Sequence, residues 1–549
     1  MYQQDPDPLA GDLALSALLA AIPLLVLFLM LGVFRVRAGL ASLIGLVLSL
    51  GIAAFVYGMP LGLALNAAAE GAAFGLFPAM WIVVNAIWIY RLTVASGHFD
   101  VLRRAFASIS DDQRIQGIII AFSFGALLEA LAGFGAPVAI CAVMLVAIGL
   151  QPLKAATVAL IANTAPVAYG AVALPIITLA QVTGLPQDEL SAMTGRQVPL
   201  LALFVPFVLV VVLDGRRGLR EVWPAALVCG STFAFVQFLM ANFGAIELTD
   251  IAASLASALV LLVLLRAWQP RKRDGDLREN PAPLDAEGPG SGAGTAVLTR
   301  KTDSRPEVVR ALAPYTVIIG LFSVSAVPQI SSLLEQTTRK FPWPGLDVRS
   351  VEGEPLALTS FKFDWLASGG TVLLIAGLIS VLVLGLSGRQ AMRAYGETLR
   401  QLRTAVLTVT AVLAIAYVMN LSGQTATMGL FLAGAGGLFS ALSPLLGWFG
   451  TAVTGSDTSS NSLFGALQVS AAEGAGLHPV LTAGSNTSGG VLGKMISPQN
   501  LAVGAGAVGL AGREGELFRR VLAVTVIFLP LTCLLTYLQS TAVLSWMVP

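Results

Sequence analysis

The stretch Thr454-Gly-Ser-Asp-Thr-Ser-Ser-Asn461 places an acid, several hydroxyls and an amide inside a region otherwise built from Ala, Leu, Val, Gly and Phe. Asn486-Thr-Ser-Gly-Gly490 and Lys494 follow it downstream. Such polar groups are costly at membrane depth unless they face a cavity, a ligand or one another. We therefore expect the rest of the chain to form a frame around this polar stretch.

The composition is that of a polytopic α-helical membrane protein. Of the 549 residues, 56% are hydrophobic and 11% are charged, against roughly 25% charged in an average soluble protein. Apolar runs of about twenty residues recur from end to end, which is the length a helix needs to cross a bilayer. The period-two alternation of outer-membrane strands is absent from the sequence.

Several function classes are excluded by charge and by residue content. The formal net charge is +1, so there is no electrostatic case for nucleic acid as a partner. Each of the three cysteines lies in an apolar run and the two histidines stand apart from them, so we expect no metal and no other cofactor. The first apolar run follows Asp5, Asp7 and Asp12 without a basic n-region, which predicts a retained helix rather than a signal peptide.

Ten apolar runs are predicted to be uninterrupted helices, and three other segments differ in character. Residues 98–114 have the spacing of an amphipathic helix at the membrane surface. Residues 269–306 are rich in Pro, Gly, Ser and charge, which predicts a flexible linker, and 331–364 form a polar loop. The expected helices are 13–34, 38–57, 61–90 (weak near Gly75-Leu-Phe-Pro78), 198–213, 219–243, 246–268, 310–327, 365–386, 400–421 and 517–546.

The remaining apolar segments are broken by glycine and proline. Residues 115–149 surround Gly133-Phe-Gly-Ala-Pro137, and 444–473 surround the opening stretch. Because each run is too short to span comfortably, we expect two re-entrant hairpins; the alternative is a pair of true spans at each. Residues 153–183 and 480–510 are predicted to be broken helices.

The chain also carries an internal repeat. Asn163-Thr-Ala-Pro-Val-Ala-Tyr-Gly170 and Asn486-Thr-Ser-Gly-Gly-Val-Leu-Gly493 share Asn-Thr, the last Gly and a Pro twelve residues after the Asn. Placing all basic loops in the cytoplasm gives about twelve spans with both termini outside. The halves 1–268 and 307–549 then run in opposite directions. Inverted repeats with interrupted helices are typical of secondary transporters.

The polar residues near these interruptions are candidates for a binding site. Backbone N–H groups at the ends of broken helices attract the oxygens of an anion, and hydroxyls and amides add donors for a small carboxylate that bears a hydroxyl group. Capping of the helix ends is a compatible role. The candidate substrate-binding residues are Gly133, Gly135, Asn163, Thr164, Tyr169, Ser456, Thr458, Ser459, Asn461, Asn486, Thr487, Ser488 and Lys494.

Charged residues at membrane depth suggest ion coupling. Asp457, Glu129 and Glu70 are candidate proton carriers, because burial favours the neutral form of a carboxyl group; a paired structural carboxylate is the alternative for each. Three roles are open for Lys494: counter-charge to a substrate carboxylate, partner of Asp457, or a side chain that reaches the inner membrane surface.

At these motifs the sequence resembles the lactate permease family of bacterial carriers. The resemblance is carried by four stretches, with support from Asp111-Asp-Gln-Arg114 and Trp546-Met-Val-Pro549. The four are Leu128-Glu-Ala-Leu-Ala-Gly-Phe-Gly-Ala-Pro-Val-Ala-Ile140, Asn163-Thr-Ala-Pro-Val-Ala-Tyr-Gly170, Thr454-Gly-Ser-Asp-Thr-Ser-Ser-Asn461 and Gly493-Lys-Met-Ile-Ser-Pro-Gln499. More distantly, the hairpins and broken helices resemble the wider ion-transporter superfamily.

The resemblance implies a multi-pass protein of the bacterial inner membrane that is not an enzyme. It implies import of L-lactate and related 2-hydroxymonocarboxylates, such as glycolate and D-lactate, by proton symport. A sodium-coupled carboxylate transporter and a passive small-anion channel are the alternatives. The expected partners are the carboxylate, protons and the lipid bilayer, and both a monomer and a homodimer stay open.

Overall fold

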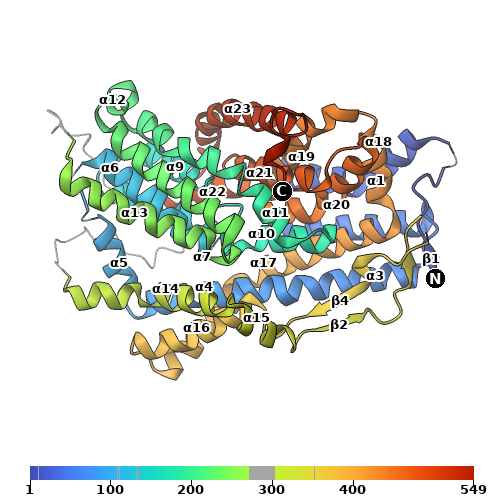
Figure 1. The fold of residues 1–549 in the computed structure, drawn as a ribbon, viewed down its shortest axis with the longest axis horizontal. Helices are drawn as coiled ribbons and strands as arrows, with labels where there is room; N and C mark the ends of the chain where they lie inside the picture. The colour runs from blue at the N-terminus through green and yellow to red at the C-terminus, as the bar shows by residue number, and fades with distance from the viewer. Residues whose placement is uncertain are drawn as a thin grey trace.

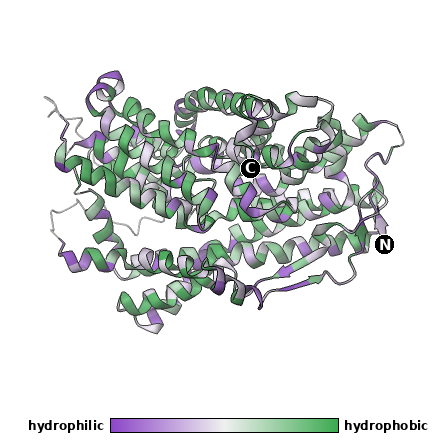
Figure 2. Ribbon diagram, in the orientation of Figure 1, coloured by the Kyte–Doolittle hydropathy of each residue, from purple (hydrophilic) through white to green (hydrophobic). Residues whose placement is uncertain are grey.

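The protein is almost entirely helical. The structure is a computed structural model, and it describes residues 1–270 and 303–549 apart from Ala10, Ser108, Asp111, Ala132, Phe134 and Glu352. Many of the longer helices lie along the long axis of the molecule (Figure 1). Hydrophobic residues cover most of these helices, whereas strands β2 and β4 are hydrophilic (Figure 2). The strands are β1 Tyr2–Gln3, β2 Arg339–Pro342, β3 Val348–Arg349 and β4 Ser360–Phe363.

In the first half, most predicted helices are present, some with a π-helical turn inside them. The helices are α1 Leu13–Phe28, α2 Ala38–Phe55, α3 Leu61–Phe74, α4 Trp81–Ala95, α5 His98–Ala107, α6 Gln113–Gly117, α7 Gly125–Leu131, α8 Ala136–Ala147, α9 Pro152–Ala162, α10 Gly170–Thr183, α11 Gln187–Thr194, α12 Val198–Phe243 and α13 Thr249–Ala267. π-Helical turns at Leu29–Val33, Gly75–Met80 and Ile118–Phe124 extend α1, join α3 to α4 and join α6 to α7.

The second half begins after the residues that the structure does not describe. Its helices are α14 Arg305–Ser325, α15 Pro328–Glu335, α16 Gly369–Val383, α17 Gly388–Ser422, α18 Gln424–Ala433, α19 Phe439–Thr454, α20 Asp457–Ala475, α21 Pro479–Lys494, α22 Pro498–Ala507 and α23 Glu514–Gln539. The predicted linker falls mainly on 271–302, outside the described residues. Its predicted end at 306 is two residues late, because α14 begins at Arg305.

Ten stretches of the described chain are long and apolar enough to cross a membrane. This confirms a polytopic α-helical protein, while the count of about twelve spans stays a prediction. One expectation is wrong: the first arm of the 115–149 hairpin is not short, because Gln113–Leu131 is a continuous helical stretch of 19 residues. A bend at Gly215 (φ 65°, ψ −156°) divides α12 into the two predicted helices.

Two elements are longer or more ordered than expected. α17 begins at Gly388 rather than near 400, because Ser387 and Gln390 form a reciprocal capping box at its N-terminus. The predicted polar loop 331–364 contains an antiparallel pairing of β2 with β4. Strand β3 of the same region pairs in parallel with β1 at the N-terminus, and the hydroxyl of Tyr2 donates to the carbonyl of Ser422 at the end of α17 (2.9 Å).

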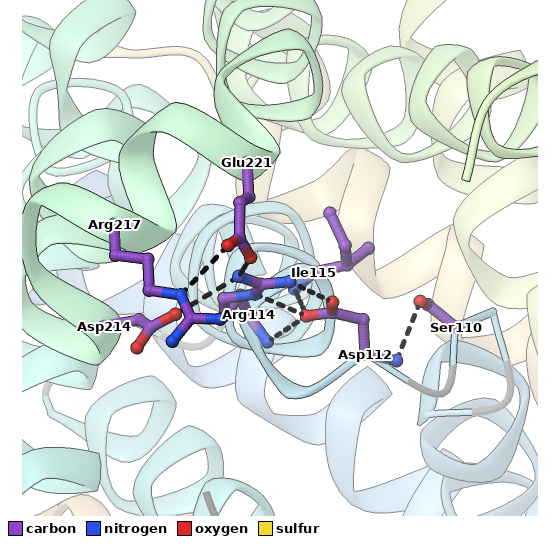
Figure 3. A network of polar contacts seen from close by, with 7 residues as sticks. All are labelled: Ser110, Asp112, Arg114, Ile115, Asp214, Arg217 and Glu221. Atoms are coloured by element: carbon purple, nitrogen blue, oxygen red, sulfur yellow. Dashed lines mark hydrogen bonds and ion pairs between the residues drawn. The ribbon is translucent and has the colours of Figure 1, made fainter. Parts of the chain in front are cut away.

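A buried arginine ties the first hairpin to α12 (Figure 3). Arg114, in α6, is 1% exposed. Its guanidinium donates to Asp112 Oδ2 at 2.7 Å, to Asp214 Oδ2 at 3.2 Å and to Glu221 Oε2 at 2.5 Å. Arg217 donates to the other oxygen of Glu221 at 3.1 Å. The start of the hairpin is therefore fixed against both limbs of α12.

Replacing Arg114 by methionine is expected to lower the free energy of unfolding by about 3 kcal/mol, because three poorly solvated carboxylates lose the buried cation that they share. Thermal unfolding of the detergent-solubilised protein measures the change. Arg217→Met is the control: Arg217 is exposed and also pairs with Glu221, so its loss costs about 0.5 kcal/mol or less. Equal effects of the two changes would contradict the role given to Arg114.

The second broken helix is interrupted at a different place from the one predicted. We expected the break at Asn486-Thr-Ser-Gly-Gly490, but α21 is continuous through these residues to Lys494, and the interruption is at 495–497. In the first copy the interruption is at 163–169, as predicted. The Asn-Thr residues that match in the repeat therefore lie at a helix break in the first half of the chain but inside a continuous helix in the second half.

The glycines of α21 explain the difference, because they allow close helix packing. A Cβ atom at Gly489 would overlap the carbonyl oxygen of Pro444, and one at Gly493 would overlap that of Trp448, both in α19. Small residues that let two helix backbones touch are a common device in membranes. Glycine marks contact with a neighbouring helix here, not a break.

We expect Gly489→Ala to lower the free energy of unfolding by about 1–3 kcal/mol, since its methyl group would push α19 away from α21. Gly506→Ala, in α22, is the matched control: a Cβ atom there meets no atom within 4 Å. Thermal unfolding of the two variants measures this, and Gly489→Ala should be the less stable of the two. Equal stability of both would show that α19 and α21 are not in tight contact.

Candidate functional site

A cavity lies where the two hairpin tips meet the first helix break. Its empty volume, including the part that is open to solvent, is about 380 Å³. The first tip contributes Gly133, and the second contributes Gly455 to Thr458. Both tips therefore border the same cavity. The lining residues are Glu129, Gly133, Val167, Gly170, Ala171, Leu174, Pro175, Gly455, Ser456, Asp457, Thr458 and Lys494.

A buried ion pair forms one wall of the cavity. Lys494 at the end of α21 is paired with Oε1 of Glu129 in α7. Their side chains are 8% and 2% exposed, so Lys494 does not reach a membrane surface. Asn163, the first residue of the first break, donates from Nδ2 to Oε2 of Glu129 at 2.9 Å. Both oxygens of Glu129 thus accept a hydrogen bond.

Asp457 lines the same cavity and has one side-chain donor among the described residues, against two for Glu129. The hydroxyl of Thr451 donates to Oδ1 of Asp457 at 3.3 Å. Oδ2 is buried and has no hydrogen-bond partner among the described residues. Asp457 and Lys494 are near enough to attract one another, although Lys494 is paired with Glu129. The cavity therefore holds one ammonium group and two carboxyl groups in different surroundings.

The N-terminus of α20 supplies further donors. Ser456 caps the helix by accepting the N–H of Ser459 at 3.3 Å. The N–H groups of Asp457 and Thr458 precede the first intrahelical bond, and within the described chain neither has an acceptor. An N-terminus with free N–H groups attracts an anion. The Ser456 and Thr458 hydroxyls line the cavity beside it.

A strained turn at the start of α10 also borders the cavity, next to Glu129. Ala171, Val172 and Ala173 have φ angles of 45°, 58° and 60°, in a left-handed region that costs about 1–2 kcal/mol per residue. A Cβ atom at Gly170 would stand 3.1 Å from Oε1 of Glu129, so the backbone approaches that carboxylate closely. Strain of this kind concentrates at functional sites.

Several predicted binding residues point elsewhere. Asn461 donates to Thr487 Oγ1 (2.9 Å) and accepts from Asn486 Nδ2 (2.8 Å), which holds α20 to α21. Gly135 packs against α22 rather than the cavity. The other hydrogen bonds go to carbonyl oxygens: Thr164 to Ile161, Tyr169 to Ser191 and Ser488 to Gly484. Ser459 is buried outside the lining.

Glu70 does not line the cavity either. It lies in α3, is 1% exposed, and neither of its oxygens has a hydrogen-bond partner in the described chain. For Lys494 the structure adds a fourth role to the three left open by the sequence: it pairs with Glu129 while staying in the cavity wall.

Two buried residues that sequence reasoning missed lie just behind the break. Asp250, in the first turn of α13, accepts a hydrogen bond from Gln237 Nε2 at 2.8 Å. The same nitrogen donates to the carbonyl of Ala165, inside the break, at 3.1 Å. The sequence does show Asp250 as an acid near the start of an apolar run. Because it stands near the end of a predicted helix, it resembles a residue at the membrane surface and was not selected as a buried one.

The sequence matches the family model described as L-lactate permease over residues 16–543. The chain belongs to the L-lactate permease family. It is 42% identical to glycolate permease GlcA of Escherichia coli K12, over 96% of each chain. It is 40% identical to the L-lactate permeases of Bacillus subtilis 168 and of Escherichia coli K12, in each case over the full length of both chains.

Two solved structures match at low identity and low TM-score. They are the YdaH transporter of Alcanivorax borkumensis (16% identity, TM-score 0.43, 86% of each chain) and the MtrF efflux pump of Neisseria gonorrhoeae (14%, 0.46, covering 86% of this chain and 82% of that one). The resemblance stated from the sequence motifs is confirmed by the family match. The chain is a multi-pass membrane protein of a permease family, not an enzyme.

Proposed function

We propose that this protein imports L-lactate, glycolate and related 2-hydroxymonocarboxylates across the bacterial inner membrane by proton symport. The names of its relatives, L-lactate permease and glycolate permease, support the substrate class. The coupling is supported by one observation: Asp457, one of whose oxygens has no partner among the described residues, shares a cavity with the buried Lys494–Glu129 pair.

The substrate's carboxylate is received by Lys494 and by the free N–H groups of α20. Both are positive, and both border the cavity. The Ser456 and Thr458 hydroxyls are placed to bond the 2-hydroxyl group. A carboxylate removed from water needs such donors, because an unpaired charge is very costly in an apolar region.

The proton is carried by Asp457. When Asp457 is ionised, it attracts Lys494 and repels an anion at the α20 N-terminus, so substrate is excluded. When Asp457 is protonated, Lys494 and the helix N-terminus are free to take the substrate. Like charges in one site disfavour joint ionisation, so the anion and the proton bind together. Glu129 keeps Lys494 in place through its own pair and through Asn163.

The support for an inverted repeat comes from the packing of the half-helices. The second arm of each hairpin, α8 or α20, packs against the second half of the other repeat's broken helix, α22 or α10 respectively. This exchange of partners is what a pseudo-two-fold axis through the cavity would generate. We therefore keep the two halves 1–268 and 307–549 as the proposed repeat units.

Uptake of labelled lactate into proteoliposomes tests the proposal. With the interior alkaline, we expect lactate to accumulate about tenfold per pH unit, since 1.4 kcal/mol corresponds to a factor of ten, and to do so without sodium. Accumulation that requires a sodium gradient would replace proton by sodium coupling. Equilibration without accumulation under either gradient would indicate a passive channel.

A panel of competitors defines the substrate class. Glycolate and D-lactate should reduce labelled L-lactate uptake strongly, whereas acetate, which lacks the 2-hydroxyl, should compete weakly. A substrate that lacks a hydrogen-bonding group leaves buried donors of the site unpaired. It therefore loses more binding free energy than a substrate that lacks a methyl group. Equal competition by acetate and glycolate would remove the role given to Ser456 and Thr458.

A further inference from the structure

Behind the first helix break lies a buried acid–amide pair that does not face the cavity. Asp250 is 1% exposed and Gln237 is completely buried. Gln237 uses both hydrogens of its Nε2, one toward Asp250 Oδ1 (2.8 Å) and one toward the carbonyl of Ala165 (3.1 Å). The pair joins α12 and α13 to the break.

Each member of the pair has one oxygen without a donor. Asp250 Oδ2 and Gln237 Oε1 are both buried and have no hydrogen-bond partner among the described residues. Each of these oxygens belongs to a group that the Asp250–Gln237 hydrogen bond already joins, so the two acceptors lie within one bonded pair. Two unpartnered acceptors are unfavourable as they stand, since each unmet buried polar atom costs about 1–3 kcal/mol.

One proton would satisfy both oxygens together. We propose that Asp250 holds a proton on Oδ2 and donates it to Gln237 Oε1, closing a cyclic acid–amide pair with two antiparallel hydrogen bonds. No covalent bond between heavy atoms is made or broken. The proton comes from water, and the carboxyl group becomes neutral.

The charges around Asp250 agree with a neutral acid. Among the elements packed on it, α7 contributes a second acid, Glu129, which is paired with Lys494. The break contributes the Tyr169 hydroxyl, which donates to Ser191 O, and α12 contributes the Cys229 thiol beside Ser123. Glu247, one turn earlier, adds another acid. Among the described residues no ion pair involves Asp250, and Lys494 in the cavity wall is paired with Glu129.

The proton on Asp250 therefore positions the break. Asn163 is held by Glu129 on one side, and Ala165 is held through Gln237 by Asp250 on the other. Asp250 does not touch the cavity, so it acts through the backbone of 163–169 as a positioning residue. This role is independent of which ion drives transport.

Infrared difference spectroscopy of the purified wild-type protein against Asp250→Asn at neutral pH, in sodium-free buffer, tests the proposal. We expect the variant to lose one carbonyl band of a protonated carboxylic acid, a band that shifts in heavy water. The introduced asparagine can form the equivalent amide–amide ring with Gln237, so the variant should fold. Unchanged acid bands would show that Asp250 is ionised and would overturn the proposal.

Gln237→Leu provides the second variant. It keeps Asp250 but removes its amide partner, so the acid band should persist at a higher frequency because its carbonyl accepts no hydrogen bond. A band that stays in place would mean that the proton is not shared with Gln237. Repeating the wild-type spectrum in sodium chloride distinguishes a metal ion: loss of the acid band on adding sodium would show a sodium site in place of the proton.

Discussion

Asp457→Asn is expected to abolish pH-driven accumulation of lactate while leaving exchange of internal for external lactate within about tenfold of wild type. Asparagine resembles protonated aspartate in shape and charge, so Lys494 and the α20 N-terminus stay available for the substrate. The variant cannot release a proton, so the pH gradient can no longer do work on the substrate. The accumulation ratio in proteoliposomes should fall to one.

The matched control is Glu473→Gln. Glu473 is a carboxylate of the same helix that lies exposed at its far end. Its replacement should leave both accumulation and exchange unchanged. Wild-type accumulation by Asp457→Asn would remove Asp457 from the coupling mechanism, and loss of exchange together with accumulation would show that its charge is needed for binding.

Lys494→Met is expected to abolish both uptake and exchange, by at least about 100-fold, because two or more charge-assisted hydrogen bonds are worth about 3 kcal/mol. It should also destabilise the fold by about 3–5 kcal/mol, since Glu129 would be left as an unpaired buried charge. Thermal unfolding and exchange assays on the same preparation measure the two effects.

The double variant Glu129→Gln with Lys494→Met separates folding from binding. It removes the uncompensated charge, so stability should return to within about 1–2 kcal/mol of wild type, as when a buried pair is replaced by neutral groups. Exchange should stay absent because the substrate has lost its cation. A double variant that regains transport would show that Lys494 serves the fold alone.

The helical membrane architecture follows from apolar run length, and the sequence was sufficient for it. The breaks were harder, because glycine has two uses in membrane helices. At Gly133 and Gly135 it permits positive φ angles of 50° and 81° in the hairpin turn, as predicted. At Gly489 and Gly493 it permits contact with α19, and the prediction of a break there was wrong.

The partners of the buried charged residues also could not be predicted from the sequence. A pair with Asp457, in the same half of the chain, was one of three roles left open for Lys494. The structure pairs Lys494 with Glu129, 365 residues away. Likewise the polar side chains of Asn461, Asn486 and Thr487 satisfy one another across α20 and α21. A donor-rich motif therefore identifies a polar region, while the three-dimensional packing decides which donors remain free.

Counting protons and lactate together tests the central claim most directly. Vesicles with a trapped pH indicator receive labelled lactate with no starting gradient, and internal acidification is compared with the label taken up, after subtraction of empty vesicles. We predict equal numbers of protons and lactate for the wild type, and exchange of lactate without acidification for Asp457→Asn. Lactate entry through the wild type without acidification, or unchanged acidification in Asp457→Asn, would contradict proton symport through Asp457.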